Sequence, residues 1–169
     1  NGDLYFTDQG QTGLHDPRGR VFRLTADGRL DKLLDNGPSP NGLVLTPQEN
    51  WLYVAMTRAN AIWRLPLMPD GHVSKVGQFI QLSGGHGPDG LAIDETGGLV
   101  VCHFGLGSVW HFSPLGEPLH RVRSPAGLGT TNVAFGGPER RTLFITESES
   151  GSILAADLPV AGAGVFGLS

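Results

Sequence analysis

An internal repeat of about 45 residues constrains the fold of this chain more than any local pattern does. Its most regular part is an apolar triplet, which occurs as Leu4-Tyr5-Phe6, Leu52-Tyr53-Val54, Leu99-Val100-Val101 and Leu143-Phe144-Ile145. A second apolar segment follows each triplet, at residues 21–24, 62–65, 109–112 and 153–156. Repetition at a fixed long period indicates copies of one structural unit and not a chain of unrelated elements.

Two further strand-like segments belong to the unit. One precedes the last three triplets, at residues 41–45, 89–93 and 132–135, and a weaker one closes the first three units, at 30–34, 73–82 and 119–122. Many of the 26 glycines and 12 prolines stand between these segments, where tight turns need them. Four short strands in about 45 residues are typical of one blade of a β-propeller. A β-sandwich has similar strand spacing, but it has no reason to repeat at this period.

The sequence therefore predicts an all-β fold, with residues 1–169 forming about three and a half blades of a propeller as a single partial domain. Because natural propellers close with about 4–8 blades, we expect further blades N-terminal to Asn1. The chain starts with Asn1 inside a strand-like segment and without a Met, which agrees with that expectation. The compartment stays open, with the cytoplasm favoured, and the oligomeric state is open as well.

Composition excludes several kinds of partner. The formal net charge is −4 with scattered Lys and Arg, so the sequence shows no footprint of a nucleic-acid-binding protein. No apolar run is long enough to cross a bilayer, and the single Cys102 leaves no internal disulfide to form. A small neutral or anionic molecule is the expected ligand. We assign His72, His86, His111 and His120 to the surface or to turns.

Alignment of the repeats places polar residues at equivalent positions. Asn41, Asp89 and Asn132 each stand at the entrance to the innermost strand of a blade. In one interpretation, Asn and Asp merely form turns by bonding to their own backbone. In the other, oxygen donors that recur in register converge on a hard divalent cation such as Ca²⁺, since Zn²⁺ would prefer imidazole or thiolate.

A second set of polar residues is expected just outside that ring. Antiparallel strands bring the start of the first strand and the end of the second to the same face of a blade. The ends of the second strands carry Asp8, His103 and Glu147, and the loop 9–19 contributes Asp16. We expect these four residues, together with Asn132, to line a substrate pocket, and Asn41 and Asp89 to hold the metal.

The order of these motifs resembles the family of senescence marker protein, gluconolactonase and luciferin-regenerating enzyme, which are six-bladed propellers. The resemblance rests on residues 1–8, Pro40-Asn41-Gly42-Leu43, residues 87–94 and residues 131–138, and so covers nearly the whole chain. It implies that Asn41 and Asp89 bind a divalent cation, most often calcium, with Zn²⁺, Mg²⁺ or Mn²⁺ as alternatives. An N-terminal Glu ligand and a Pro-Asn-Asp motif of the family would lie upstream of Asn1.

The resemblance also implies hydrolysis of a lactone, with Asp89 as both metal ligand and catalytic base. Two rivals stay open. One is a non-catalytic ligand-binding propeller, in which Asn and Asp only form turns. The other is a metal-independent enzyme of the strictosidine-synthase-like kind, which would use a carboxylate such as Glu147 or Asp8. Since blades and ligands are expected upstream, we expect residues 1–169 alone to be inactive.

Overall fold

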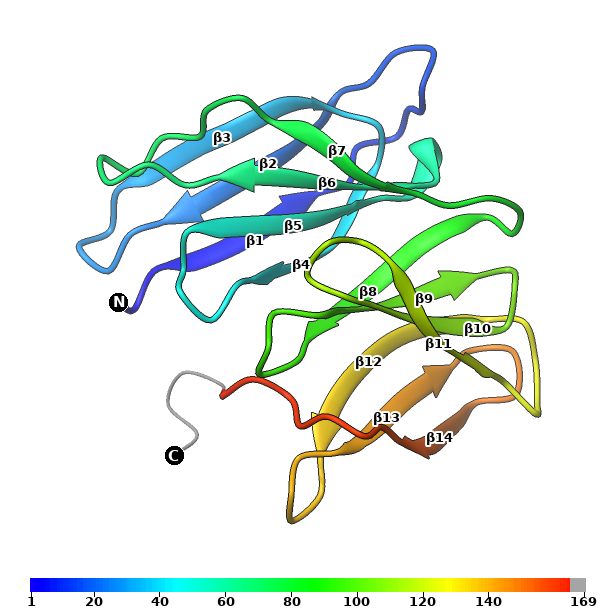
Figure 1. The fold of residues 1–169 in the computed structure, drawn as a ribbon. Coiled ribbons are helices and arrows are strands. Elements are labelled where there is room, and N and C mark those ends of the chain that lie inside the picture. The colour runs from blue at the N-terminus through cyan, green and yellow to red at the C-terminus, as the bar shows by residue number, and fades with distance from the viewer. Residues whose placement is uncertain (165–169) are drawn as a thin grey trace.

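The computed structural model describes residues 1–164 of the 169 and contains four antiparallel sheets that follow one another in chain order (Figure 1). Blade 1 consists of β1 (Leu4–Asp8), β2 (Gly19–Leu24) and β3 (Leu30–Gly37). Blade 2 consists of β4 (Pro40–Leu45), β5 (Trp51–Met56), β6 (Ala61–Pro66) and β7 (Gly77–Gln81), with the 3₁₀ turn η1 (Thr57–Ala59) between β5 and β6. Blade 3 consists of β8 (Gly87–Ile93), β9 (Leu99–Phe104), β10 (Ser108–Phe112) and β11 (Pro118–Arg123). Blade 4 consists of β12 (Thr130–Gly136), β13 (Thr142–Glu147) and β14 (Ser152–Asp157).

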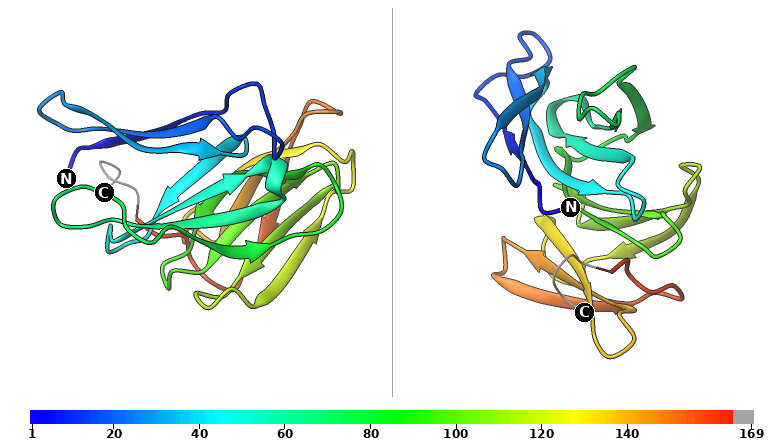
Figure 2. Two further views of the ribbon diagram at one scale, coloured as in Figure 1. Left: turned by 90° about the horizontal axis from the view of Figure 1, so that it is seen from above. Right: turned by 90° about the vertical axis from the view of Figure 1, so that its left-hand side faces the viewer.

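The four sheets are arranged as successive blades of a propeller. Within each sheet the strands pair in sequence order, and the right-hand view of Figure 2 shows the sheets as an open arc. The first strand of blade 3, β8, contacts both β4 and β12 where the blades converge. Sheets of three, four, four and three strands confirm the predicted all-β fold and its blade period. The predicted outer segment 73–82 is shorter in the structure, because residues 67–76 form a turn closed by a bridge between Leu67 and Val73.

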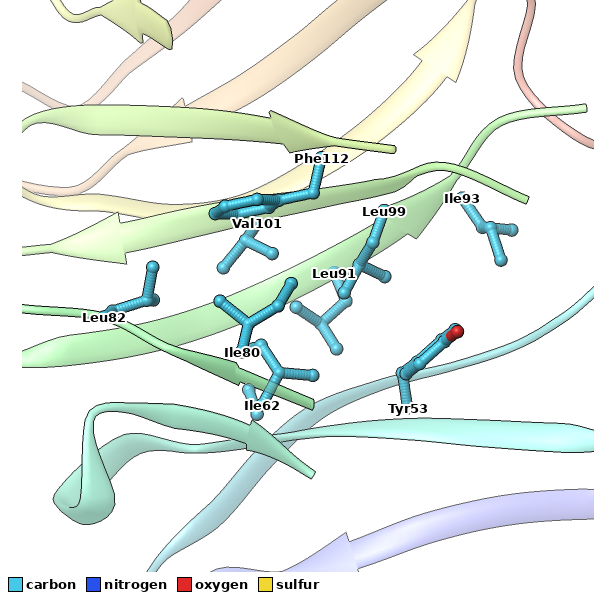
Figure 3. Packing of buried hydrophobic residues seen from close by; sticks show 10 residues of the cluster. Tyr53, Ile62, Ile80, Leu82, Leu91, Ile93, Leu99, Val101 and Phe112 are labelled. Atoms are coloured by element: carbon cyan, nitrogen blue, oxygen red, sulfur yellow. The ribbon is translucent and has the colours of Figure 1, made fainter. Parts of the chain in front are cut away.

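The hydrophobic core consists of layers between neighbouring blades. Strand β5 is buried on both faces: Leu52 and Val54 pack towards blade 1, while Tyr53 and Ala55 pack towards blade 3. Figure 3 shows Tyr53 and Ile62 of blade 2 facing Leu91 of blade 3. Because alternate residues of a strand point to opposite faces, a strand between two layers must be apolar throughout. This requirement explains the repeated apolar triplets.

The two outermost blades each leave one apolar face in contact with solvent. Leu4 of β1 is 63% exposed, and Ile153 of β14 is 73% exposed. These values contrast with the complete burial of Leu52, which is equivalent to Leu4, and of Ile62, which is equivalent to Ile153, in blade 2. No helix in residues 1–164 has the length and apolar character needed to cross a membrane.

One histidine assignment was wrong. His111 is buried, whereas His72, His86 and His120 are exposed as expected. The His111 Nε2 atom lies 2.8 Å from the carboxylate of the buried Asp94, and its Nδ1 atom lies 3.0 Å from Nδ1 of His120. A histidine can occupy the interior of a blade because both ring nitrogens are paired.

Asp94 also closes the turn between β8 and β9. Its carboxylate accepts hydrogen bonds from the backbone nitrogens of Thr96 and Gly98, each at 2.8 Å. Burial alone would raise the pKa of this carboxyl, but the hydrogen bonds from Thr96, His111 and Gly98 outweigh it, and the pKa lies below its ordinary value. Asp94 is therefore an ionised structural residue that holds both a turn and a buried histidine.

We predict that Asp94→Ala lowers the free energy of unfolding by about 3 kcal/mol, because it leaves His111 and the turn amides without a partner. The measurement is chemical denaturation at neutral pH. Asp157→Ala is the control, since this exposed carboxylate has Thr142 as its one hydrogen-bond partner within residues 1–164 and its loss should cost less than about 1 kcal/mol. Equal losses in the two variants would contradict the structural role of Asp94.

Candidate functional site

Two glycines bring the entrances of the innermost strands together. A Cβ atom on Gly42 would lie 2.2 Å from the carbonyl oxygen of Asp89, and one on Gly90 would lie 2.1 Å from Oδ1 of Asn132. Both distances are far below van der Waals contact, so only glycine permits this approach. The Asn-Gly motif of β4 and the Asp-Gly motif of β8 thus lie side by side, and Asn132 of β12 lies next to the second of them.

The Asn41 amide is held so that its oxygen is left free. The Thr57 hydroxyl donates to the carbonyl oxygen of Pro88 at 2.8 Å, and it lies 3.4 Å from Nδ2 of Asn41. Because the single hydroxyl proton goes to Pro88, Thr57 accepts from the Asn41 nitrogen, and this fixes the orientation of the amide. No residue among 1–164 donates a hydrogen bond to Oδ1 of Asn41, which is therefore available to a ligand.

Asp89 is a half-buried carboxylate without a partner among the described residues. No hydrogen bond or ion pair reaches it, and burial raises the pKa of its carboxyl to about 6. The neighbouring Cys102 thiol is buried, and burial together with the charge of Asp89 raises the pKa of Cys102 above its ordinary range. A charged group in this position requires a cation or a proton to be stable.

The third residue of the ring has a different role. Oδ1 of Asn132 accepts a hydrogen bond from the backbone nitrogen of Val133 at 2.9 Å, as expected for a turn-forming asparagine. The turn interpretation therefore fits Asn132. It does not fit Asn41 or Asp89, whose side-chain oxygens accept no backbone hydrogen bond among residues 1–164.

His103 is enclosed within blade 3. Its side chain is fully buried, and Trp110 donates a hydrogen bond from Nε1 to Nδ1 of His103 at 3.3 Å. Nδ1 is thus an acceptor, so Nε2 carries the proton and donates to the carbonyl oxygen of Gly84 at 2.9 Å. Burial lowers the pKa of the imidazole and keeps it neutral. With both nitrogens engaged, His103 supports the loop at Gly84, and its expected contact with substrate has no support in this geometry.

Glu147 is turned into the loops of its own blade. Its carboxylate accepts hydrogen bonds from the backbone nitrogens of Gly129 and Glu149 at 3.0 Å and from that of Ser150 at 2.8 Å. The Ser150 hydroxyl donates to it as well. This hydroxyl, followed by the backbone donors, lowers the pKa of Glu147 to about 2. Because the side chain is only 1% exposed, it organises loops, and the structure does not present it to a pocket.

Asp8 and Asp16 lie at the surface near the loop 9–18, and each faces an arginine. Oδ2 of Asp8 is 3.6 Å from Nε of Arg20, and Oδ2 of Asp16 is 2.8 Å from Nε of Arg18. Asp8 lies near the entrance of β4, because the hydroxyl of the preceding Thr7 donates to the carbonyl oxygen of Asn41 at 2.9 Å. Contact of either residue with a substrate stays a prediction.

A different hollow occupies the far ends of the inner strands. It has a volume of about 480 Å³ and is lined mainly by apolar residues of 44–47, 91–93 and 133–135. Strands β4, β8 and β12 run from Asn41 and Asp89 towards this hollow, so it lies away from the unpaired oxygens.

Within residues 1–164, Asn41 and Asp89 are the two predicted ligands whose oxygens are free to hold a cation. No group of three or more His, Cys, Asp or Glu side chains occurs together in this part of the chain. The unpartnered Asp89 carboxylate and the oriented Asn41 oxygen fit a hard divalent cation, and further oxygen donors would have to complete its coordination. Sequence reasoning missed Thr57, since nothing in the sequence shows that its hydroxyl links Asn41 to Pro88.

The sequence profile of the SMP-30/Gluconolactonase/LRE-like region matches residues 1–149. The chain belongs to this family. It is similar to 6-deoxy-6-sulfogluconolactonase of Pseudomonas putida, with 34% identity over 149 residues that cover 85% of this chain and 50% of the relative. It is also similar to gluconolactonase of Zymomonas mobilis, with 36% identity over 169 residues that cover 89% of this chain and 46% of the relative.

Among solved structures, the chain resembles regucalcin of Agrobacterium tumefaciens, described as a calcium-binding protein. The TM-score is 0.78 at 26% identity, and the match covers 98% of this chain and 60% of the other. The chain thus spans about half the length of the curated relatives it matches. The family identified from Asn41 and Asp89 and their flanking motifs is confirmed.

We predict that Gly42→Ala destabilises the protein by about 1–3 kcal/mol and weakens cation binding, because its Cβ meets the backbone of Asp89. Gly77→Ala is the matched control, since a Cβ atom there has only the Lys75 carbonyl oxygen at 4.0 Å. Thermal unfolding with and without added Ca²⁺ measures both effects. If Gly42→Ala behaved like Gly77→Ala, the close approach of β4 and β8 would be wrong.

We predict that the stability of the fold depends on pH through the ionisation of Glu147. Its folded pKa of about 2 lies below the ordinary 4.5, so ionised Glu147 stabilises the fold above pH 4.5, and this contribution is lost as the pH falls towards 2. Glu147→Gln should therefore be less stable than the wild type at pH 7, with a difference that shrinks on acidification. Urea denaturation across this range tests it, with the 80% exposed Glu139 changed to Gln as control. A difference independent of pH would refute the assignment.

Proposed function

We propose that the protein hydrolyses sugar lactones, with a divalent cation held by Asn41 and Asp89. The observation that supports this most directly is a half-buried carboxylate without a partner, next to an amide oxygen oriented by Thr57. The Pseudomonas putida and Zymomonas mobilis relatives are named as lactonases of sugar acids, and the regucalcin structure is described as calcium-binding. Membership of the same family favours the same class of reaction here.

The cation itself is part of the proposal. Oδ1 of Asn41 and the carboxylate of Asp89 are hard oxygen ligands, so Ca²⁺ is the first candidate, with Mg²⁺, Mn²⁺ or Zn²⁺ as alternatives. When bound, such an ion supplies Lewis-acid polarisation of a carbonyl oxygen. Cys102 and His103 do not compete as ligands, because the thiol stays protonated and both imidazole nitrogens are engaged.

Asp89 is the proposed catalytic base. Its carboxylate takes a proton from a water molecule as the water oxygen bonds to the lactone carbonyl carbon. The ring C–O bond then breaks, and the ring oxygen takes the proton from Asp89 and leaves as a hydroxyl, so the product is an open-chain hydroxy acid. Burial raises the pKa of this carboxyl to about 6 in the metal-free protein, and a bound cation would keep it ionised at neutral pH, so that it can accept the proton. Thr57 acts on this step only by positioning Asn41.

The geometry argues against the two rival functions. A metal-independent enzyme would need Glu147 or Asp8 as a base, yet Glu147 accepts four hydrogen bonds and its pKa is lowered to about 2. Asp8 is exposed and faces Arg20. A purely structural role for Asn41 and Asp89 would leave a half-buried carboxylate without compensation, which is costly.

In the full-length protein, we predict that Asp89→Ala lowers kcat/KM for glucono-1,5-lactone by at least about 100-fold, because it removes both a ligand and the base. Asn41→Ala should weaken Ca²⁺ affinity by about 10–100-fold while its activity recovers at high Ca²⁺ concentration. Hydrolysis rates measured during Ca²⁺ titration test both changes.

Asp70→Ala is the control, because this 70% exposed aspartate lies on an outer turn. It should retain both activity and Ca²⁺ affinity. Chelation should abolish hydrolysis, and adding metal ions back one at a time should restore it. The ion that restores activity identifies the metal that the protein uses. Undiminished activity of Asp89→Ala, or of chelated wild-type protein, would overturn the proposed mechanism.

A further inference from the structure

A polar hollow lies beside the candidate metal site, between the loop that joins β1 to β2 and the turn η1. Its volume is about 420 Å³, and its polar lining residues are Gln9, Gln11, Thr12, His15, Ser39 and Arg58. In Figure 1 and in the left-hand view of Figure 2 the dark-blue loop 9–18 lies next to η1. We call this hollow, defined by those six residues, the loop pocket.

The loop pocket contains a positive charge that nothing in the described chain neutralises. Arg58 is exposed and forms no ion pair within residues 1–164. The two carboxylates on the adjoining segment are already opposite other cations, Asp16 at 2.8 Å from Arg18 and Asp8 at 3.6 Å from Arg20. No carboxylate lines the pocket. Arg58 is therefore free to bind an anion.

Thr12 supplies an independent sign of a missing ligand. Its hydroxyl oxygen is buried and has no hydrogen-bond partner among the described residues, although Thr12 lines the loop pocket. Buried hydroxyls in native proteins are almost always hydrogen-bonded. The side chains of Gln9, Gln11 and His15 offer further donors around the same space. Such a lining suits an oxyanion, which accepts several hydrogen bonds at once.

The loop pocket adjoins the site of the proposed reaction. Ser39 lies two residues before Asn41, and Arg58 directly follows Thr57, whose hydroxyl contacts Asn41 and Pro88. A molecule bound at Asn41 and Asp89 could therefore extend a substituent into the pocket. We propose that the loop pocket binds an anionic group carried by the lactone, namely a phosphate, sulfonate or carboxylate, through Arg58 and Thr12. This inference rests on the proposed lactonase function and names its substrate class.

The test uses the full-length protein and the stable products gluconate and 6-phosphogluconate, whose binding is measured by calorimetry. The wild type should bind 6-phosphogluconate at least about tenfold more tightly than gluconate, since one charge-assisted hydrogen bond contributes enough binding free energy for that ratio. Arg58→Gln should abolish the preference, and Arg58→Lys should retain part of it, because lysine keeps the charge without the planar fork. Thr12→Val should weaken 6-phosphogluconate binding several-fold at unchanged thermal stability, because its hydroxyl has no partner within the protein.

Arg29→Gln is the matched control. It removes the same charge from blade 1, at an arginine that faces Asp31 at 3.1 Å on the β2–β3 hairpin and does not line the pocket. It should leave the preference intact. Equal affinity of the wild type for both products, or equal effects of Arg29→Gln and Arg58→Gln, would overturn the proposal.

A hydrolysis assay separates this proposal from the proposed function. The ratio of kcat/KM for 6-phosphogluconolactone to that for gluconolactone should fall by at least about tenfold in Arg58→Gln. Lactonase activity without any preference for the anion would refute the loop pocket alone. An Arg58-dependent preference in binding, together with no hydrolysis of either lactone, would refute the lactonase function and leave the anion site in place.

Discussion

The close approach of β4, β8 and β12 is the constraint on which the rest of the structure depends. Gly42 lies against the backbone of Asp89, and Gly90 lies against Asn132, so the blades can converge until their apolar faces pack. The same approach places Asn41 and Asp89 on adjacent strands at one end of the arc. Packing of the blades and assembly of the candidate metal site therefore have one physical origin, and the glycine of each motif is as important as the polar residue before it.

The sequence could predict the fold because blade packing repeats. A strand such as β5, with Leu52 and Tyr53 buried in different layers, must be apolar on both faces, and that pattern recurs once per blade. Alignment of the repeats also located Asn41 and Asp89 correctly at the starts of the innermost strands. Register gives the position of a residue along a strand, however, and does not give the partners of its side chain. Equivalent positions therefore suggested a shared pocket for His103 and Glu147, whose side chains instead bond to the loops that precede their blades. The same limit concealed the pairing of His111 with Asp94.

Asp89 and Glu147 show how environment separates two carboxylates of one chain. Four donors around Glu147 stabilise its charge and lower its pKa, so it is bound to its loops and is a poor base. Around Asp89, burial removes water and no donor among residues 1–164 replaces it, so its pKa is raised to about 6. A carboxylate with hydrogen-bond donors around it stabilises the folded state. A buried carboxylate without donors destabilises it, and a bound ligand can offset this loss of stability. This contrast distinguishes the candidate catalytic residue from the structural one more clearly than their places in the repeat do.

Thr57 and Arg58 are neighbours in η1 that serve different parts of the proposed site. The Thr57 hydroxyl contacts groups of β4 and β8, and any change there would disturb both inner strands. Arg58 instead lines the loop pocket together with residues of the loop 9–18, and surface loops tolerate sequence changes better than packed strands do. In the proposed site, the residues that carry out the reaction lie on β4 and β8, whose geometry is fixed by packing. The residues that recognise the anionic substituent lie on η1 and the loop 9–18. Under the proposed function, changes in the loop would alter the preferred lactone while Asn41 and Asp89 keep their positions.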